Sequence, residues 1–197
     1  MPDLLTIVQT VGLIGLFLII FAESGLFFGF FFPGDSLLFS AGLVASNGLL
    51  NIWALVIGCI IAAILGDSVG YFTGKYMAIK LFSKDRGFIF KKKRLDDAEV
   101  FYKKHGAITI IIARFVPLIR TFAPIAAGMG KMKYKMFVIY NILGGVFWVL
   151  LLALSGYFLG KNIQNPDKYI LPIVGGIAFL SILPILYRLI SNIFKHR

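Results

Sequence analysis

Long apolar runs dominate the chain, and short polar or glycine-rich stretches separate them. A helix needs roughly 20 mostly apolar residues to cross the hydrocarbon layer of a bilayer, which is about 30 Å thick. Most of these runs approach or exceed that length, so the pattern predicts an all-α, polytopic membrane protein. The apolar segments are residues 4–32, 37–45, 52–72, 107–129, 136–159 and 169–190.

The composition agrees with this prediction. The 197 residues are 59% hydrophobic and have a mean hydropathy of +0.89, which is more apolar surface than a soluble core of this size can bury. The N-terminus lacks the basic start and small-residue cleavage site of a removable secretory signal, so we expect the first helix to be retained.

Basic residues outnumber acidic ones by 20 to 9. The long polar stretch at residues 75–105 holds ten of the basic residues. The pattern of residues 94–105 predicts a short amphipathic helix on the membrane surface. The positive-inside rule places this basic loop, about 75–106, and the C-terminus in the cytoplasm. The basic cluster adjoins membrane segments and no nucleic-acid motif accompanies it, which argues against a nucleic-acid partner.

The segment at 107–129 starts inside and is followed by Lys131, Lys133 and Lys135. A full crossing would place these lysines outside, against the rule. A re-entrant hairpin that turns around Pro117 to Thr121 would keep them inside. Residues 136–159 would then cross outward and the C-terminal transmembrane helix, about 169–190, would cross back.

An internal repeat is visible when the sequence is shifted by 86 positions. Residues 41–75 then align with 127–161 without a gap and with nine identities, of which five lie in one G-Y-F-x-G-K hexapeptide. Duplication explains this match better than chance agreement. The first copy ends at Lys75, predicted inside, and the second at Lys161, predicted outside, so the copies are inverted.

Inverted repeats with broken helices are typical of secondary transporters, whose substrate sites lie near the bilayer midplane. We therefore expect one membrane domain with repeats at about 21–75 and 107–161. By symmetry, residues 21–45 should form a second hairpin, broken around Pro33 and Gly34, whose tip faces the first.

Five ionisable residues interrupt the apolar stretches. A charge at the bilayer centre costs about 2.5 to 3.5 kcal/mol on insertion scales, so such residues face a partner or water and are functional candidates. The alternative is that they form buried ion pairs that only lock the hairpins together. They are Glu23, Asp35 and Asp67 in the first half and Arg114 and Arg120 in the second.

Opposite charges from the two halves are expected to meet in one site. Arginine binds phosphate through two parallel hydrogen bonds, and the free N–H groups at broken helix ends favour anions, so Arg114 and Arg120 predict a phosphorylated substrate. Glu23 and Asp35 are candidate proton carriers, because a poorly solvated carboxylate changes protonation as its surroundings change. Asp67 is expected to cap or brace a hairpin.

No residues predict a cofactor, a metal site or an enzyme. His105 and His196 stand alone on polar flanks, and no Ser, His and Asp set is evident. Cys59 has no Cys or His nearby and is expected only to pack.

At the five charged residues named above and in the motifs around them, the chain resembles the DedA family, also called VTT-domain or SNARE-associated membrane proteins. The resemblance covers roughly residues 21–160. It rests on Glu23-Ser-Gly25, Pro33-Gly34-Asp35, Gly66-Asp67-Ser-Val-Gly70-Tyr71, Ala113-Arg114-Phe-Val-Pro117-Leu-Ile-Arg120 and Ala126-Ala-Gly128-Met129.

The resemblance implies two facing re-entrant hairpins and lipid transport across the bacterial cytoplasmic membrane. By motif, Glu23, Asp35, Arg114 and Arg120 match the family's essential acids and arginines. Bacterial members include recyclers of undecaprenyl phosphate, the carrier lipid of wall synthesis, whereas others are linked to phosphatidylethanolamine movement, scrambling and proton-dependent drug tolerance. The expected supporting residues are Asp67, Pro33, Gly34, Pro117, Thr121 and Gly128.

We therefore expect a flippase for a phosphate-bearing lipid, most specifically undecaprenyl phosphate, with protons as a possible coupling partner. A phosphatidylethanolamine flippase or scramblase, a proton-coupled exporter of small cations, and a scaffold that recruits partners through its basic loop stay open. Homo-oligomer formation also stays open.

Overall fold

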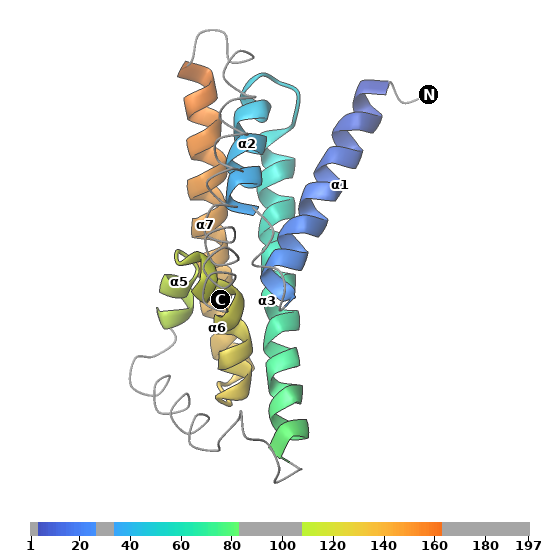
Figure 1. The fold of residues 1–197 in the computed structure, drawn as a ribbon. Helices are drawn as coiled ribbons and strands as arrows, with labels where there is room; N and C mark the ends of the chain where they lie inside the picture. The colour runs from blue at the N-terminus through green and yellow to red at the C-terminus, as the bar shows by residue number, and fades with distance from the viewer. Residues whose placement is uncertain (1–3, 27–33, 83–107, 163–197) are drawn as a thin grey trace, which may run out of the picture.

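The computed structural model describes residues 4–26, 34–82 and 108–162, and the regular structure in these ranges is entirely helical (Figure 1). This confirms the all-α prediction. The predicted amphipathic helix at 94–105, the predicted C-terminal helix at 169–190 and Pro33 lie outside the described residues. The helices are α1 (Leu4–Gly25), α2 (Gly34–Ser46), α3 (Ile52–Phe82), α5 (Ile108–Ala113), α6 (Pro117–Met129) and α7 (Tyr134–Asn162).

Two long helices form the centre of the arrangement. Figure 1 shows α3 and α7 running in opposite directions, with α2 beside α7 at one end and α6 beside α3 at the other. The short helices α2 and α6 thus each pack mainly on the long helix of the other predicted repeat, whereas α5 packs on α7 and α1 on α3. Inverted repeats are expected to produce such an arrangement, although the division at 21–75 and 107–161 stays a prediction.

Glycines allow these helices to approach backbone to backbone. A Cβ atom at Gly42 in α2 would overlap the carbonyl of Ala153 in α7, and one at Gly128 in α6 would overlap the carbonyl of Tyr71 in α3. Gly42 and Gly128 are equivalent under the 86-residue shift. The hexapeptide glycines Gly74, Gly156 and Gly160 make similar close contacts with the short helix that packs on them.

The break in the segment at 107–129 lies earlier than predicted. The chain turns at residues 114–116, and α6 begins at Pro117, so Thr121 lies inside a helix instead of in the turn. Proline suits the first helical position because its φ is already helical and its missing N–H has no partner there. Val116 before it is extended (φ −112°, ψ 107°), as the residue before a proline prefers. α5 and α6 run in opposite directions (Figure 1), but their return to one side of a membrane stays a prediction.

Helix α3 is longer than its apolar stretch. It begins after Asn51, whose side-chain oxygen accepts hydrogen bonds from the backbone N–H groups of Trp53 (2.9 Å) and Ala54 (3.1 Å). It continues through Lys75 to Phe82, since no glycine or proline follows Gly74 in this stretch to end it. The predicted loop therefore begins later than residue 75.

The outward faces of the long helices are apolar. By length and composition, Ile52–Ala78 and Tyr134–Asn162 are long and apolar enough to cross a membrane. Their exposed large side chains recur mostly at intervals of three or four residues, so they form stripes along the helices, and large exposed apolar surfaces mark contact with partners or lipid. The stripes comprise Trp53, Ile57, Ile61, Leu65, Val69, Phe72 and Tyr76 on α3, and Met136, Ile139, Leu143, Phe147, Leu151 and Phe158 on α7.

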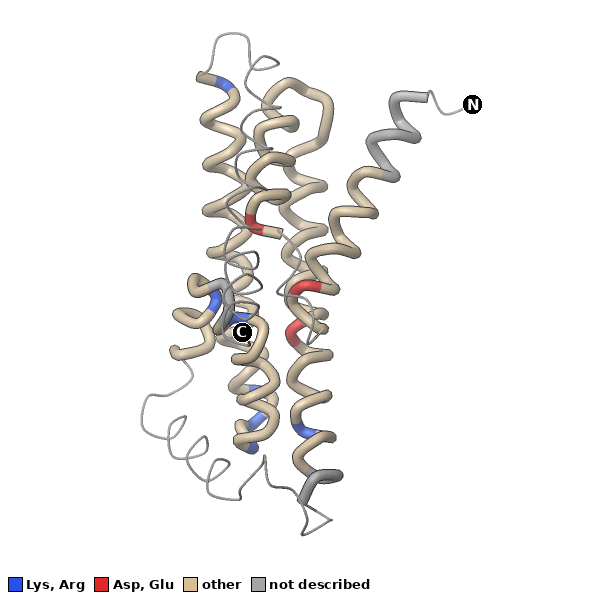
Figure 2. Tube along the Cα trace, viewed as in Figure 1, with Lys and Arg blue, Asp and Glu red and all other residues tan. Residues whose placement is uncertain are grey.

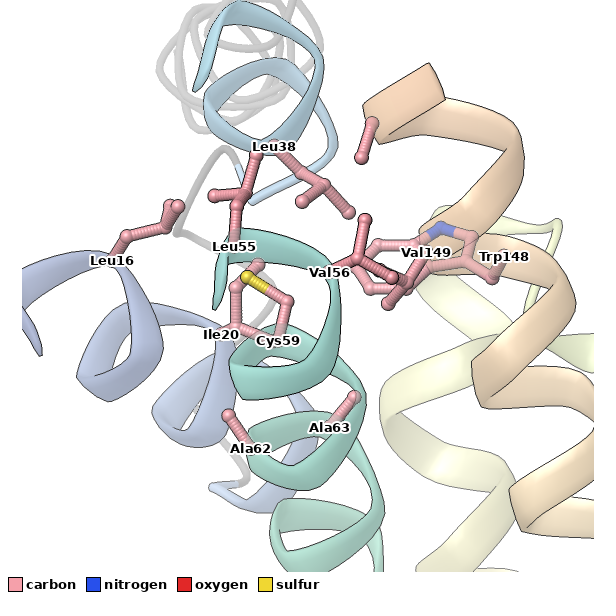
Figure 3. Close-up of a cluster of buried hydrophobic side chains, with 11 residues drawn as sticks. Leu16, Ile20, Leu38, Leu55, Val56, Cys59, Ala62, Ala63, Trp148 and Val149 are labelled. Carbon is pink, nitrogen blue, oxygen red and sulfur yellow. The ribbon is translucent and has the colours of Figure 1, made fainter. Parts of the chain in front are cut away.

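An apolar cluster joins α1, α2, α3 and α7 (Figure 3). Ile20, Leu38 and Leu55 in this cluster are fully buried. Trp148 belongs to the cluster and also contacts polar groups described below. The cluster thus supports one side of the charged site.

Candidate functional site

The five charged residues predicted from the sequence lie in two adjacent ion-pair groups. Arg120 pairs with Glu23 and with Asp35, and Arg114 pairs with Asp67. Figure 2 shows acidic and basic positions gathered at mid-height of the helices, with further basic positions at helix ends. Residues from α1, α2, α3, α6 and the turn before α6 thus meet far from either end of the molecule.

The first group places one guanidinium between two carboxylates. Nη1 of Arg120 lies 2.5 Å from Oδ1 of Asp35, and Nη2 pairs with Oε1 of Glu23. The side chains of Arg120 and Glu23 are 9% and 4% exposed, whereas that of Asp35 is 40% exposed. Asp35 is therefore the more exposed of the two carboxylates that pair with Arg120.

Glu23 is held close to the start of α2. A Cβ atom at Gly34 would overlap the Glu23 carboxylate, so a larger residue at the first position of this helix would force this carboxylate to move. The second oxygen of Glu23, Oε2, is buried and has no hydrogen-bond partner among the described residues. Burying a charged oxygen without a hydrogen-bond partner is costly. A proton on Oε2 would neutralise the carboxylate and lower this cost.

The second group is more deeply buried. Arg114 pairs with Asp67 and not with Glu23 or Asp35, and it also donates to Oδ1 of Asn141 at 2.5 Å. The amide of Asn141 in turn donates to the carbonyl of Ile64 at 3.2 Å. Arg114, Asp67 and Asn141 are 5%, 5% and 0% exposed. The group connects α3 and α7 to the turn that precedes α6.

Two residues of the site were missed in the sequence. Asn141 is polar within an apolar segment, and a buried amide in such a segment needs a partner just as a buried charge does. This position was therefore recognisable from the sequence. Trp148 in α7 gave no signal. Its indole N–H donates to Oδ1 of Asp35 at 2.9 Å, and its ring centroid lies 5.0 Å from the guanidinium carbon of Arg120 and 5.9 Å from that of Arg114.

The supporting residues occupy separate places. Gly34 and Pro117 begin α2 and α6, Thr121 is buried in α6, and Gly128 is at the α6–α3 contact. Figure 1 shows the first residues of α2 and α6 at mid-height, with the two helices leading away in opposite directions. Helix N-termini carry partial positive charge, so this arrangement favours an anion between them.

Comparison with known proteins identifies the family of the chain. Residues 32–158 match the VTT domain. The chain is 49% identical over 179 residues to protein DedA of Escherichia coli (strain K12), which covers 90% of this chain and 81% of the relative. It is 38% identical over 197 residues to an uncharacterised membrane protein of Mycobacterium tuberculosis (strain ATCC 25618 / H37Rv), covering 94% and 86% of the two chains.

A third relative is the inner membrane protein YqjA of E. coli (strain K12), with 32% identity over 147 residues, which cover 75% of this chain and 67% of the relative. No solved structure matches the chain. The two long apolar helices and relatives that are named membrane proteins indicate a membrane-embedded chain. The chain therefore belongs to the DedA family of VTT-domain membrane proteins.

Proposed function

We propose that this protein is a transporter that moves a phosphate-bearing lipid, most specifically undecaprenyl phosphate, across the bacterial cytoplasmic membrane. The observation that carries the proposal is the position of Arg120, whose guanidinium is shared by Glu23 and the partly exposed Asp35. A guanidinium that binds carboxylate in this way binds the similar face of a phosphate equally well.

The headgroup reaches Arg120 from the side of Asp35. The phosphate displaces Asp35 and takes its place on the guanidinium, while the N-termini of α2 and α6 add favourable electrostatic attraction. Arg114 contributes a second positive charge nearby. The lipid tail stays in the bilayer during this step, since only the headgroup needs shelter from hydrocarbon.

Charge balance supports proton coupling. Three carboxylates and two guanidiniums leave the site with one net negative charge when all are ionised. A bound phosphate would add further negative charge to this poorly solvated site. This is unfavourable unless one of the carboxylates takes up a proton. Oε2 of Glu23 is the candidate atom, because it lacks a partner, and Asp35 is the second candidate carrier.

Reconstitution tests the proposal. Purified protein in phosphatidylcholine vesicles is given undecaprenyl phosphate or phosphatidylethanolamine, and headgroup exposure is followed with and without a pH gradient. We expect movement of undecaprenyl phosphate that the pH gradient accelerates and that Arg120→Ala abolishes. Lys161→Ala, which removes an exposed basic side chain at the end of α7, is the matched control and should transport normally.

The choice of lipid in this experiment, together with assays of cation efflux and partner recruitment, separates the alternatives. Movement of phosphatidylethanolamine alone would indicate a phospholipid flippase or scramblase. A proton-coupled exporter of small cations, which the excess of carboxylates would suit, should keep its efflux activity in Arg120→Ala. A scaffold should tolerate Glu23→Gln but not neutralisation of the basic loop. Failure of both lipids to move contradicts the main proposal.

A further inference from the structure

Trp148 connects the two ion-pair groups. Oδ1 of Asp35 accepts two hydrogen bonds, one from Nη1 of Arg120 at 2.5 Å and one from the indole N–H of Trp148 at 2.9 Å. The guanidinium carbons of Arg120 and Arg114 both lie within 6 Å of the indole centroid, the range of a cation–π interaction. One side chain therefore contacts three of the five charged groups.

The indole is suited to hold Asp35 but not to replace Arg120. It has a single N–H donor and no acceptor, and it is 4% exposed, so its N–H needs a partner inside the protein. Its ring is fixed in the apolar cluster of Figure 3. When Arg120 leaves Asp35, the N–H still satisfies one oxygen of a carboxylate that would otherwise lose its charged partner.

We infer that Trp148 is the positioning residue of the transport site, which holds Asp35 while Arg120 exchanges this carboxylate for a phosphate. The inference rests on the proposed function. Its ring also lies within cation–π distance of both guanidiniums. Trp148 thus acts through Asp35 and Arg120 and need not touch the lipid.

Trp148→Phe tests the hydrogen bond, because it keeps an aromatic ring and removes the N–H. In vesicles with undecaprenyl phosphate we expect the maximal rate to fall about tenfold or more, with a smaller change in the lipid concentration at half-maximal rate. Trp148→Phe combined with Asp35→Ala should be no slower than Asp35→Ala alone, since both changes remove the hydrogen bond between the indole N–H and Oδ1 of Asp35. A normal rate in Trp148→Phe, or effects that add, would overturn the inference.

A second measurement keeps Trp148 in place. The chain has two tryptophans, and Trp53 is 66% exposed on the outer stripe of α3, so Trp53→Phe leaves Trp148 as the sole indole emitter. Geranyl phosphate added to this protein in detergent should shift the emission, and Asp35→Ala, which removes the acceptor of the indole N–H, should abolish the shift. A shift that survives Asp35→Ala would contradict the inference.

These arms separate the inference from the proposed function. If the protein moves no phosphate lipid but Trp148 emission still changes on Asp35→Ala and on pH titration, the transport proposal fails and the positioning role stands. If the protein transports the phosphate lipid and Trp148→Phe leaves the rate unchanged, the transport proposal stands and the positioning role fails.

Discussion

At the scale of single residues, the two arginines differ in their surroundings. Arg114 is enclosed by Asp67 and Asn141, whereas Asp35, one of the partners of Arg120, is 40% exposed. The enclosed pair of Arg114 with Asp67 joins α3 to the turn before α6. On the proposed function, only the pair of Arg120 with Asp35 exchanges its partner. The two arginines are therefore expected to respond differently to substitution.

Removing the partner of Arg114 should destabilise the fold. Asp67→Ala leaves a buried positive charge without its carboxylate, which costs about 3 to 5 kcal/mol when one member of a buried pair is lost. We expect a clear fall in the thermal unfolding temperature of the detergent-solubilised protein. Asp67→Leu combined with Arg114→Met should recover part of the loss, because no unpaired charge is left. An Asp67→Ala protein as stable as the wild type would contradict this role.

Gly34 should be essential for transport and less so for folding. In Gly34→Ala the new methyl group takes the place of the Glu23 carboxylate, which must move away from Arg120 along its flexible side chain. We expect the lipid transport rate in vesicles to drop strongly while the protein stays folded in detergent. Gly15→Ala is the matched control, since a Cβ there meets nothing within 4 Å. Equal transport rates in both variants would show that the contact between Gly34 and Glu23 does not affect transport.

At the scale of helices, the fold depends on backbone contacts at repeated glycines. A methyl group at Gly128 meets the carbonyl of Tyr71, and one at Gly42 meets that of Ala153. Backbone cannot move aside as a side-chain end can, so α6 must separate from α3, or α2 from α7.

We therefore expect Gly128→Ala and Gly42→Ala each to lower stability by about 1 to 3 kcal/mol, the usual cost of overpacking. Thermal unfolding followed by size-exclusion chromatography measures the effect. Gly12→Ala, in open space on α1, should be neutral or slightly stabilising. Unchanged unfolding of both contact variants would mean that these helices are not tightly packed in the membrane.

At the scale of the whole molecule, the predicted topology can be tested by thiol labelling. Cys59 is the single cysteine, so Cys59→Ala provides a cysteine-free background. With a membrane-impermeant reagent, we expect Lys75→Cys and Lys131→Cys to react only from the cytoplasm. Asn47→Cys, in the exposed turn between α2 and α3, should react only from outside. Labelling of Lys75→Cys and Lys131→Cys from opposite sides would exclude a re-entrant hairpin.

The sequence predicted the helical class and the charged positions because both depend on local composition and on the cost of burying charge. It misplaced the turn at 114–116, since Pro117 breaks a helix or begins one equally well and only the neighbouring backbone decides which. It also left open which acid meets which base. The pairing of Arg114 with Asp67 depends on how α6 sits along α3, and the roles of Asn141 and Trp148 depend on which face of α7 turns inward.

The crossed packing of short on long helices has a consequence for the origin of the chain. A polypeptide ending after α3 would leave the glycine seam at Gly70 and Gly74 uncovered, because α6 fills it in the complete protein. Two copies of such a half-length chain, inserted in the membrane with opposite orientations, would cover each other's glycine seams. If the predicted inverted repeats are correct, a half-length protein would therefore need a second copy of opposite orientation to bury its glycine seam.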